Sequence, residues 1–119
     1  MLAGTHTPDS LIAGTTQTVA DSVTILTGQT LTRGAVLGKI TVGGKFTLSA
    51  SGAADGSQTP YAILAEDCDA SGGDVTNVAV YIKGEFNENV LSFGTGHDAT
   101  TVKAPLRDVG IFTKLAVGA

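Results

Sequence analysis

The chain has 119 residues, of which 42% are hydrophobic and 15% are charged, and its formal net charge is −4. This length fits one domain, the single cysteine excludes an internal disulfide, and no run reaches the roughly 18 apolar residues that a membrane helix needs. The seven basic residues are scattered along the chain, so nucleic-acid binding, which needs Lys and Arg gathered on one face, is not expected.

The first 20 residues differ in composition from the rest of the chain. They are rich in Thr, Gly and Ala, they contain no Lys or Arg, and their one apolar step is Leu11–Ala13. Because no periodicity is sustained, we predict a flexible N-terminal arm over residues 1–20 and a β-rich domain over 21–119. The arm lacks the basic start and long apolar run of a signal peptide. It is either a processing remnant or a segment that orders on a partner by adding a strand to a sheet edge.

From Asp21 onward the pattern predicts short strands separated by glycine turns. The expected strands are 22–26, 36–41, 45–49, 61–65, 76–83 and 111–117. The Gly43-Gly44 pair predicts a hairpin, because two glycines readily take the positive φ angles of a tight turn. Apolar and polar residues alternate over 76–83, which predicts one inward face, and Gly84 is expected to end that strand.

Two short helical turns are expected among these strands. One spans 87–91, and the other spans 104–109, with Pro105 in its first turn and Gly110 as its stop. The sequence therefore predicts a small, mainly β, single-domain fold with one or two short helices. The aromatic residues interpreted as part of its core are Tyr61, Tyr81, Phe86 and Phe93.

A candidate metal loop occurs at 67–72, where oxygen-bearing side chains at Asp67, Asp69 and Ser71 precede a glycine. A calcium loop of this kind closes with a Glu at its twelfth position, which here is Val78, so a calcium site is not expected. Cys68 has no partner at zinc-site spacing and is interpreted as a small buried hydrophobic residue. No metal or other cofactor is therefore expected.

The sequence offers weak candidates for catalysis. The adjacent pair His97–Asp98 does not by itself make a proton relay, and Glu85 with Glu88 is interpreted as a solvated pair. The glycines of 94–96 lack the third glycine of a dinucleotide loop, since Ala99 takes that position. We therefore expect no catalytic residues and no enzymatic activity.

Four blocks in order resemble one family, the head decoration proteins of tailed bacteriophages, which are similar to the lambda head protein D. The blocks are GQTLTRGAVLGKI at 28–40, ADGSQ with AILAED between 54 and 67, YIKGEFN at 81–87 and LRDVGIF at 106–112. Each block is a weak signal alone, whereas their order and spacing cover about residues 20–115.

The resemblance implies a β-clip-like fold and a homotrimer that binds the major capsid protein at the threefold sites of the expanded head. Such a protein stabilises the shell against the pressure of packaged DNA. It lies on the outer surface of the virion after a period in the host cytoplasm during assembly, without nucleic-acid or membrane contacts. The resemblance also implies that the arm attaches to the shell, and the candidate contact residues are Thr5, Thr7, Pro8, Leu11 and Ile12.

Two other functions remain open from the residues. A glycan-binding or adhesive β module would need an exposed aromatic platform, although aromatic residues are only 5% of the chain. A nucleotide hydrolase on a β-clip fold would need acidic and glycine motifs that we do not find.

Overall fold

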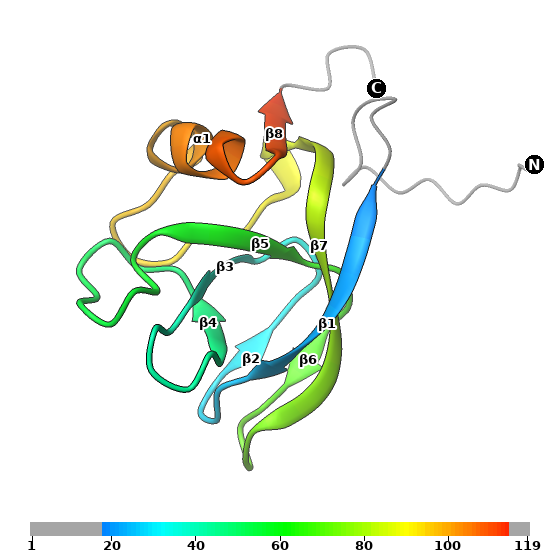
Figure 1. Cartoon of the computed structure of the whole chain (residues 1–119), viewed down its shortest axis with the longest axis vertical. Coiled ribbons are helices and arrows are strands. Elements are labelled where there is room, and N and C mark those ends of the chain that lie inside the picture. The colour runs from blue at the N-terminus through cyan, green and yellow to red at the C-terminus, as the bar shows by residue number, and fades with distance from the viewer. Residues whose placement is uncertain (1–17, 115–119) are drawn as a thin grey trace, which may run out of the picture.

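The computed structural model describes residues 18–114 and confirms a mainly β single domain. Figure 1 shows strands wrapped into a barrel-like sheet, with one helix against its upper side. The strands are β1 (Val19–Ile25), β2 (Thr30–Leu31), β3 (Val36–Lys39), β4 (Phe46–Leu48), β5 (Pro60–Leu64), β6 (Cys68–Asp69), β7 (Val75–Asn87) and β8 (Ile111–Lys114). The helices are the 3₁₀ turn η1 (Glu88–Val90), which confirms the expected turn at 87–91, and α1 (Ala99–Asp108).

The main sheet has the order β1-β4-β3-β5-β7-β8, and β7 also pairs with β1. This second pairing closes β1, β4, β3, β5 and β7 into a ring, and β8 extends β7 as a parallel partner. The predicted hairpin is confirmed, because β3 and β4 pair antiparallel and both Gly43 and Gly44 have positive φ. The two short strands β2 and β6 pair antiparallel and form a separate small sheet.

The expectation that Gly84 ends a strand is wrong. β7 continues through it, with Val75–Lys83 facing β1 and Gly84–Asn87 pairing with β8. Gly84 adopts φ +145°, and a Cβ there would lie 3.1 Å from the Phe86 ring. The glycine therefore allows one strand to change partners, rather than terminating it.

Two hydrophobic clusters lie on opposite faces of the sheet, because neighbouring residues of a strand point to opposite sides. On β3 and β5, Leu37 and Leu64 enter the cluster inside the barrel, whereas Val36 and Ile63 enter the cluster under α1. The barrel cluster also holds Cys68, which confirms its interpretation as a buried hydrophobic residue. Phe86 is fully buried in the second cluster, whereas Tyr61 is 39% exposed, so its interpretation as a core residue is wrong.

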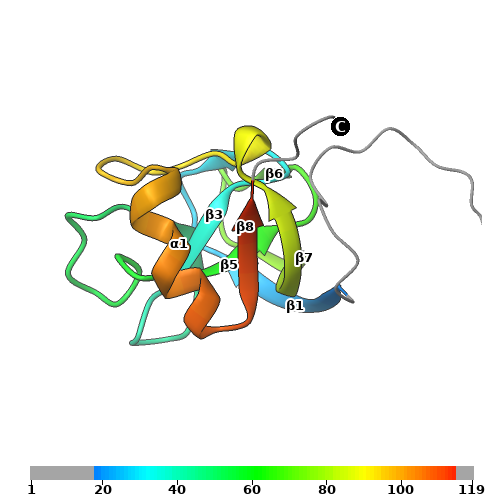
Figure 2. The same ribbon diagram turned by 90° about the horizontal axis from the view of Figure 1, so that it is seen from above.

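The helix α1 is longer than predicted and starts earlier. Asp98 caps it by accepting hydrogen bonds from the N–H groups of Thr100 and Thr101, and Thr101 bonds back to the Asp98 N–H. Pro105 therefore lies inside the helix and not in its first turn. The capping box and the buried side chains set the start of the helix more strongly than the proline does. The helix packs against β8 and β5 on one face of the sheet (Figure 2). Its buried residues are Val102 and Leu106.

The remaining element boundaries shift by a few residues. The predicted strand at 22–26 starts three residues earlier, at Val19, and that at 61–65 spans Pro60–Leu64. The predicted arm falls outside the described residues except for 18–20, of which Val19 and Ala20 belong to β1. Within residues 18–114, no helix is long and apolar enough to cross a bilayer.

Candidate interaction surface

The five residues expected to contact a shell lie outside the described part of the chain. They are Thr5, Thr7, Pro8, Leu11 and Ile12. The first strand that follows them in the chain is β1, which begins at Val19.

One edge of β1 is paired along its length and the other is largely open. Its register with β7 runs from Val19, opposite Lys83, to Ile25, opposite Val75. On the other side, Ile25 is the one described residue of β1 that pairs with β4, and its partner there is Phe46. The N–H of Ser22 donates to the carboxylate of its neighbour Asp21 at 2.8 Å, a local bond that replaces a strand partner. Such a side-chain cap is typical of a sheet edge that faces solvent.

A groove of about 530 Å³ runs beside this open edge. On the β1 side it is lined by Asp21 through Thr24, and on the far side by residues of β3, β4 and β5. The residues that complete its lining are Lys39, Gly44, Phe46, Tyr61, Ile82 and Val109. The groove is therefore partly apolar, and it borders a strand edge that can accept backbone hydrogen bonds.

Tyr61 and Lys39 stand between this groove and a second hollow of about 360 Å³. The Lys39 ammonium lies 5.7 Å from the centre of the Tyr61 ring, and the Phe46 ring lies 5.8 Å from the same centre. An ammonium over an aromatic face is attracted by the ring quadrupole. This stack holds a half-exposed aromatic ring in place at the rim of the groove.

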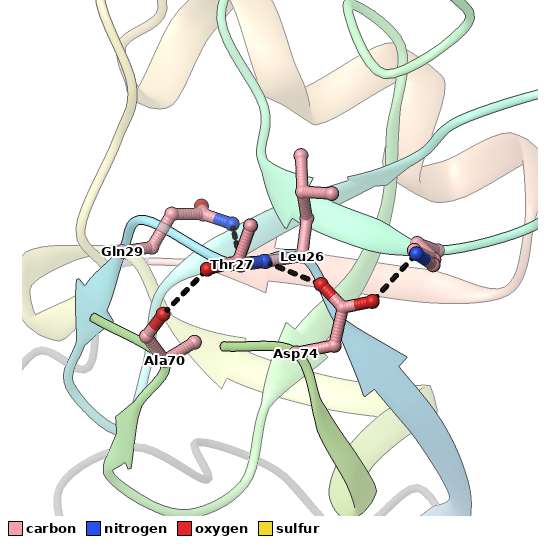
Figure 3. Close-up of polar contacts among 6 residues, drawn as sticks. Leu26, Thr27, Gln29, Ala70 and Asp74 are labelled. Carbon is pink, nitrogen blue, oxygen red and sulfur yellow. Dashed lines mark hydrogen bonds and ion pairs between the residues drawn. The ribbon is translucent and has the colours of Figure 1, made fainter. Parts of the chain in front are cut away.

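A polar cluster fixes the turn that follows β1 (Figure 3). The carboxylate of Asp74 accepts a hydrogen bond from the Thr27 N–H at 2.8 Å and pairs with the Lys45 ammonium at 2.5 Å. The Lys45 bond and the Thr27 N–H lower the pKa of the Asp74 carboxyl below its ordinary value. The cluster thus joins the turn after β1, the start of β4 and the loop before β7.

Gln29 strengthens the same corner from inside the turn. Its Nε2 donates to the Leu26 carbonyl at 2.9 Å, as Figure 3 shows. Its Oε1 accepts from the Thr47 hydroxyl at 2.8 Å and from the Leu48 N–H at 2.9 Å. One amide side chain therefore links the turn after β1 to β4 by three hydrogen bonds.

The candidate calcium loop is organised by internal hydrogen bonds. The carboxylate of Asp67 accepts from the Arg33 N–H at 2.8 Å, whereas that of Asp69 accepts from the N–H and hydroxyl of Ser71. The hydrogen bonds from Ser71 lower the pKa of the Asp69 carboxyl. Cys68 lies between the two aspartates in the sequence, and burial raises the pKa of its thiol. Among residues 18–114, no three potential metal ligands gather at one point.

The histidine of the adjacent His97–Asp98 pair serves the fold. Its Nε2 lies 2.8 Å from the Gln58 carbonyl and its Nδ1 lies 3.0 Å from the Thr101 hydroxyl. In the neutral ring Nε2 must carry the proton, since a carbonyl only accepts. Asp98 uses its carboxylate to cap α1, so the two side chains do not form a relay. Of the two glutamates considered as an acid–base pair, Glu88 forms an ion pair, in which its carboxylate lies 3.8 Å from the Lys103 ammonium.

The described surface thus belongs to a small β domain whose prominent features suit contact with another chain: an open strand edge, a groove and an exposed aromatic ring. The comparison with protein families agrees with this class. The family model of the bacteriophage lambda head decoration protein D matches residues 1–111, and the chain belongs to this family. No curated protein matches the chain. The resemblance of the four sequence blocks is thereby confirmed.

Sequence reasoning missed the groove, and one signal could have indicated it. The first four residues of β1 are all exposed, although β1 belongs to the closed ring of strands and pairs with both β4 and β7. In the sequence this stretch, Val19–Ser22, has no inward apolar alternation to match that of 76–83. This missing alternation indicates that the start of β1 buries no side-chain face, which leaves its surface available for another contact.

Proposed function

We propose that this chain is a capsid cement protein, which binds as a trimer at the threefold sites of an expanded phage head. The observation that carries the proposal is the family match over residues 1–111. That match includes the whole predicted arm, which supports a role for the arm within the family's function rather than a processing remnant. The partners are two further copies of the chain and the major capsid protein, met in the host cytoplasm as the virion assembles.

The stabilising effect follows from linkage. A protein that binds the expanded shell and not its precursor shifts the shell toward the expanded state by its binding free energy. At a free concentration of 100 times Kd this amounts to about 2.7 kcal/mol for each site. Because a head carries many threefold sites, small contributions add up to a large resistance against the outward pressure of packaged DNA.

Trimerisation makes each attachment stronger than one chain could. Three linked copies present three arms, so that once the first is bound the others bind at a high effective concentration. The arm is suited to an extended contact, because it carries no Lys or Arg and is rich in β-branched Thr. We assign shell contact to Thr5, Thr7, Pro8, Leu11 and Ile12, in a segment that pairs with an edge strand of the shell.

Sedimentation and head binding test the proposal directly. The purified chain is expected to sediment as a trimer, to bind expanded heads and not to bind unexpanded precursors. Electron microscopy of heads with and without the protein should show added density at the threefold positions. A chain that stays monomeric at high concentration and leaves heads undecorated would contradict the proposal.

A shortened chain separates attachment from folding. Deleting residues 2–14 removes the assigned contact residues and leaves β1 complete, so the midpoint of urea unfolding should stay unchanged while attachment to heads weakens. The matched control is Thr100→Ala, an exposed change on α1 that removes no residue of the arm. Equal head binding by the deletion variant and the control would show that the arm is not the shell contact.

A further inference from the structure

We propose that the groove binds carbohydrate, with the Tyr61 ring against one face of a sugar and the polar rim of the groove bonded to its hydroxyl groups. The ligand class is a short, neutral oligosaccharide. Such a site would give the domain a binding function in addition to the cementing of a shell, and it does not rest on the proposed function.

The place of the groove in the barrel supplies the first argument. Every strand of the closed ring lines it, and the residues contributed by β1, β3, β4, β5 and β7 include Val23, Lys39, Phe46, Tyr61 and Ile82. The groove is therefore the open mouth of the barrel, a place where proteins often bind small molecules. Its volume of about 530 Å³ lies within the range of roughly 300–1,000 Å³ that is usual for ligand pockets.

The floor of the groove is apolar. Phe46 belongs to the barrel cluster, and Val23 and Ile82 pack against that cluster, so the floor is continuous with the core. A ligand that rests on this floor is shielded from water on one side. The shielding strengthens the hydrogen bonds that the ligand makes at the rim, because they form in a less polar medium.

The rim offers both donors and acceptors, and its charges balance. Oδ1 of Asp21 accepts from the Ser22 N–H, so Oδ2 would accept from a ligand hydroxyl, and the Lys39 ammonium would donate to another. Among the residues that line the groove and the second hollow, Asp21 is the one acid and Lys39 the one base. A neutral ligand with many hydroxyl groups fits this balance, whereas a phosphate-rich ligand needs several bases.

Tyr61 supplies the aromatic platform that a glycan-binding module needs. Its side chain is 39% exposed, and its ring is held between the Lys39 ammonium, 5.7 Å from the ring centre, and the Phe46 ring at 5.8 Å. A sugar ring presents a face of C–H groups, which the negative face of an aromatic ring attracts. Because the Tyr61 ring is already held in place, little conformational freedom is lost when a sugar binds to it.

The second hollow extends the site past the Tyr61 ring. Besides Lys39 and Tyr61, its lining includes Thr41 and Thr59, whose hydroxyl groups both donate and accept hydrogen bonds. A linear oligosaccharide would therefore lie across Tyr61, with sugars in both hollows and the ring between them. This arrangement favours an oligosaccharide over a single sugar.

Many copies would make a weak site effective. On a decorated head, the sites of neighbouring domains would bind one polysaccharide surface together, so the binding of each raises the effective concentration for the next. This step alone rests on the proposed function. The test of the site is therefore made on the purified chain without heads.

A glycan array with the purified native chain tests the inference. We expect retention of neutral oligosaccharides in about 1 M NaCl, where attraction between simple charges is screened. The amide signals of Asp21 and Tyr61 should shift in NMR spectra when a retained oligosaccharide is added, whereas that of Phe112 should not. Retention of no glycan, retention that disappears in this salt, or shifts confined to other surfaces would overturn the inference.

Four variants separate the platform from general effects on the fold. Tyr61→Ala should weaken binding by about tenfold or more, and Tyr61→Phe, which keeps the ring, by no more than about threefold. The matched control is Phe112→Ala, because Phe112 is also 39% exposed but lies on β8, outside both hollows. Asp21→Asn changes only the exposed rim and should weaken binding by about threefold, since hydrogen bonds to charged groups are the stronger ones.

The midpoint of urea unfolding is measured for each variant, so a loss of binding is compared only among folded proteins. Equal binding by Tyr61→Ala and Phe112→Ala would overturn the inference, and if Tyr61→Ala fails to fold, unchanged binding by Asp21→Asn would do so. Sedimentation and head binding are measured separately. A chain that decorates heads without binding glycans leaves the cement function standing, and one that binds glycans without decorating heads leaves the site standing.

Discussion

Gly38 of β3 tests how tightly the loop at 50–59 is held against the barrel. A Cβ at this position would lie 2.6 Å from the carbonyl carbon of Ser57 and closer still to its oxygen. The loop cannot easily retreat, because the buried Ser49 hydroxyl donates to that same oxygen at 2.7 Å. Gly38 cannot move away either, since it pairs with Thr47 of β4 and Pro60 of β5.

Gly38→Ala should therefore be strongly destabilising. Overpacking against side chains costs about 1–3 kcal/mol, and a clash between two fixed backbones belongs at the upper end, at about 3 kcal/mol or more. For a domain of this length that loss corresponds to a fall in Tm of roughly 12 °C. Urea unfolding followed by circular dichroism gives the free energy, and a thermal scan gives Tm.

The matched control is Gly52→Ala in the same loop. A Cβ at Gly52 meets no atom within 4 Å, and this glycine does not have a positive φ. The control should therefore change the free energy of unfolding by no more than about 0.5 kcal/mol. If Gly38→Ala and Gly52→Ala unfold at the same urea concentration, the reasoning from backbone contact is refuted.

Three further predictions concern the cap, the polar cluster and the thiol. Asp98→Ala removes the cap of α1 and should cost about 1 kcal/mol in urea unfolding; Asp108→Ala, at the other end of the helix, should cost nothing, and equal losses would contradict the capping role. The pKa of Asp74 is lowered in the folded protein, so its stabilisation is present above 3.8 and is lost as the pH falls through the folded pKa. In urea titrations, the free energy of unfolding of Asp74→Asn should therefore fall less steeply below pH 3.8 than that of the unchanged protein. The same acid dependence in both proteins would contradict the stabilising role of the Asp74 contacts. Cys68 is buried and burial raises its pKa, so a thiol reagent should label it only as fast as the protein opens, with immediate labelling of the native protein as the contrary result.

The sequence predicted the fold best where the signal was local. The Gly43-Gly44 hairpin and the strand 76–83 were correct, because the positive φ of a turn and the alternation of a half-buried strand are written into adjacent residues. Pro105 misled the prediction of α1, since the rule for prolines at helix starts is weaker than the cap at Asp98. Tyr61 misled the prediction of the core, because an aromatic residue is equally suited to a groove rim.

The candidate surface was only half accessible to sequence reasoning. The arm was predicted from its composition and lies almost wholly outside the described residues. The family was recognised from four ordered blocks, which the family model then confirmed. The groove was not predicted, because its lining comes from β1, β3, β4, β5, β7 and the end of α1. Lys39 and Val109, for example, are 70 positions apart, and no local sequence pattern predicts that they line the same groove.

By itself, the sequence determined that this is a small, mainly β chain of the head decoration family, with sparse charge and a distinct N-terminal segment. Only the tertiary structure decided that β7 continues through Gly84 to bind β8, and that one edge of β1 stays open beside a groove. The physical reason is that turns and alternation depend on neighbouring residues, whereas strand partners depend on which distant surfaces are buried together.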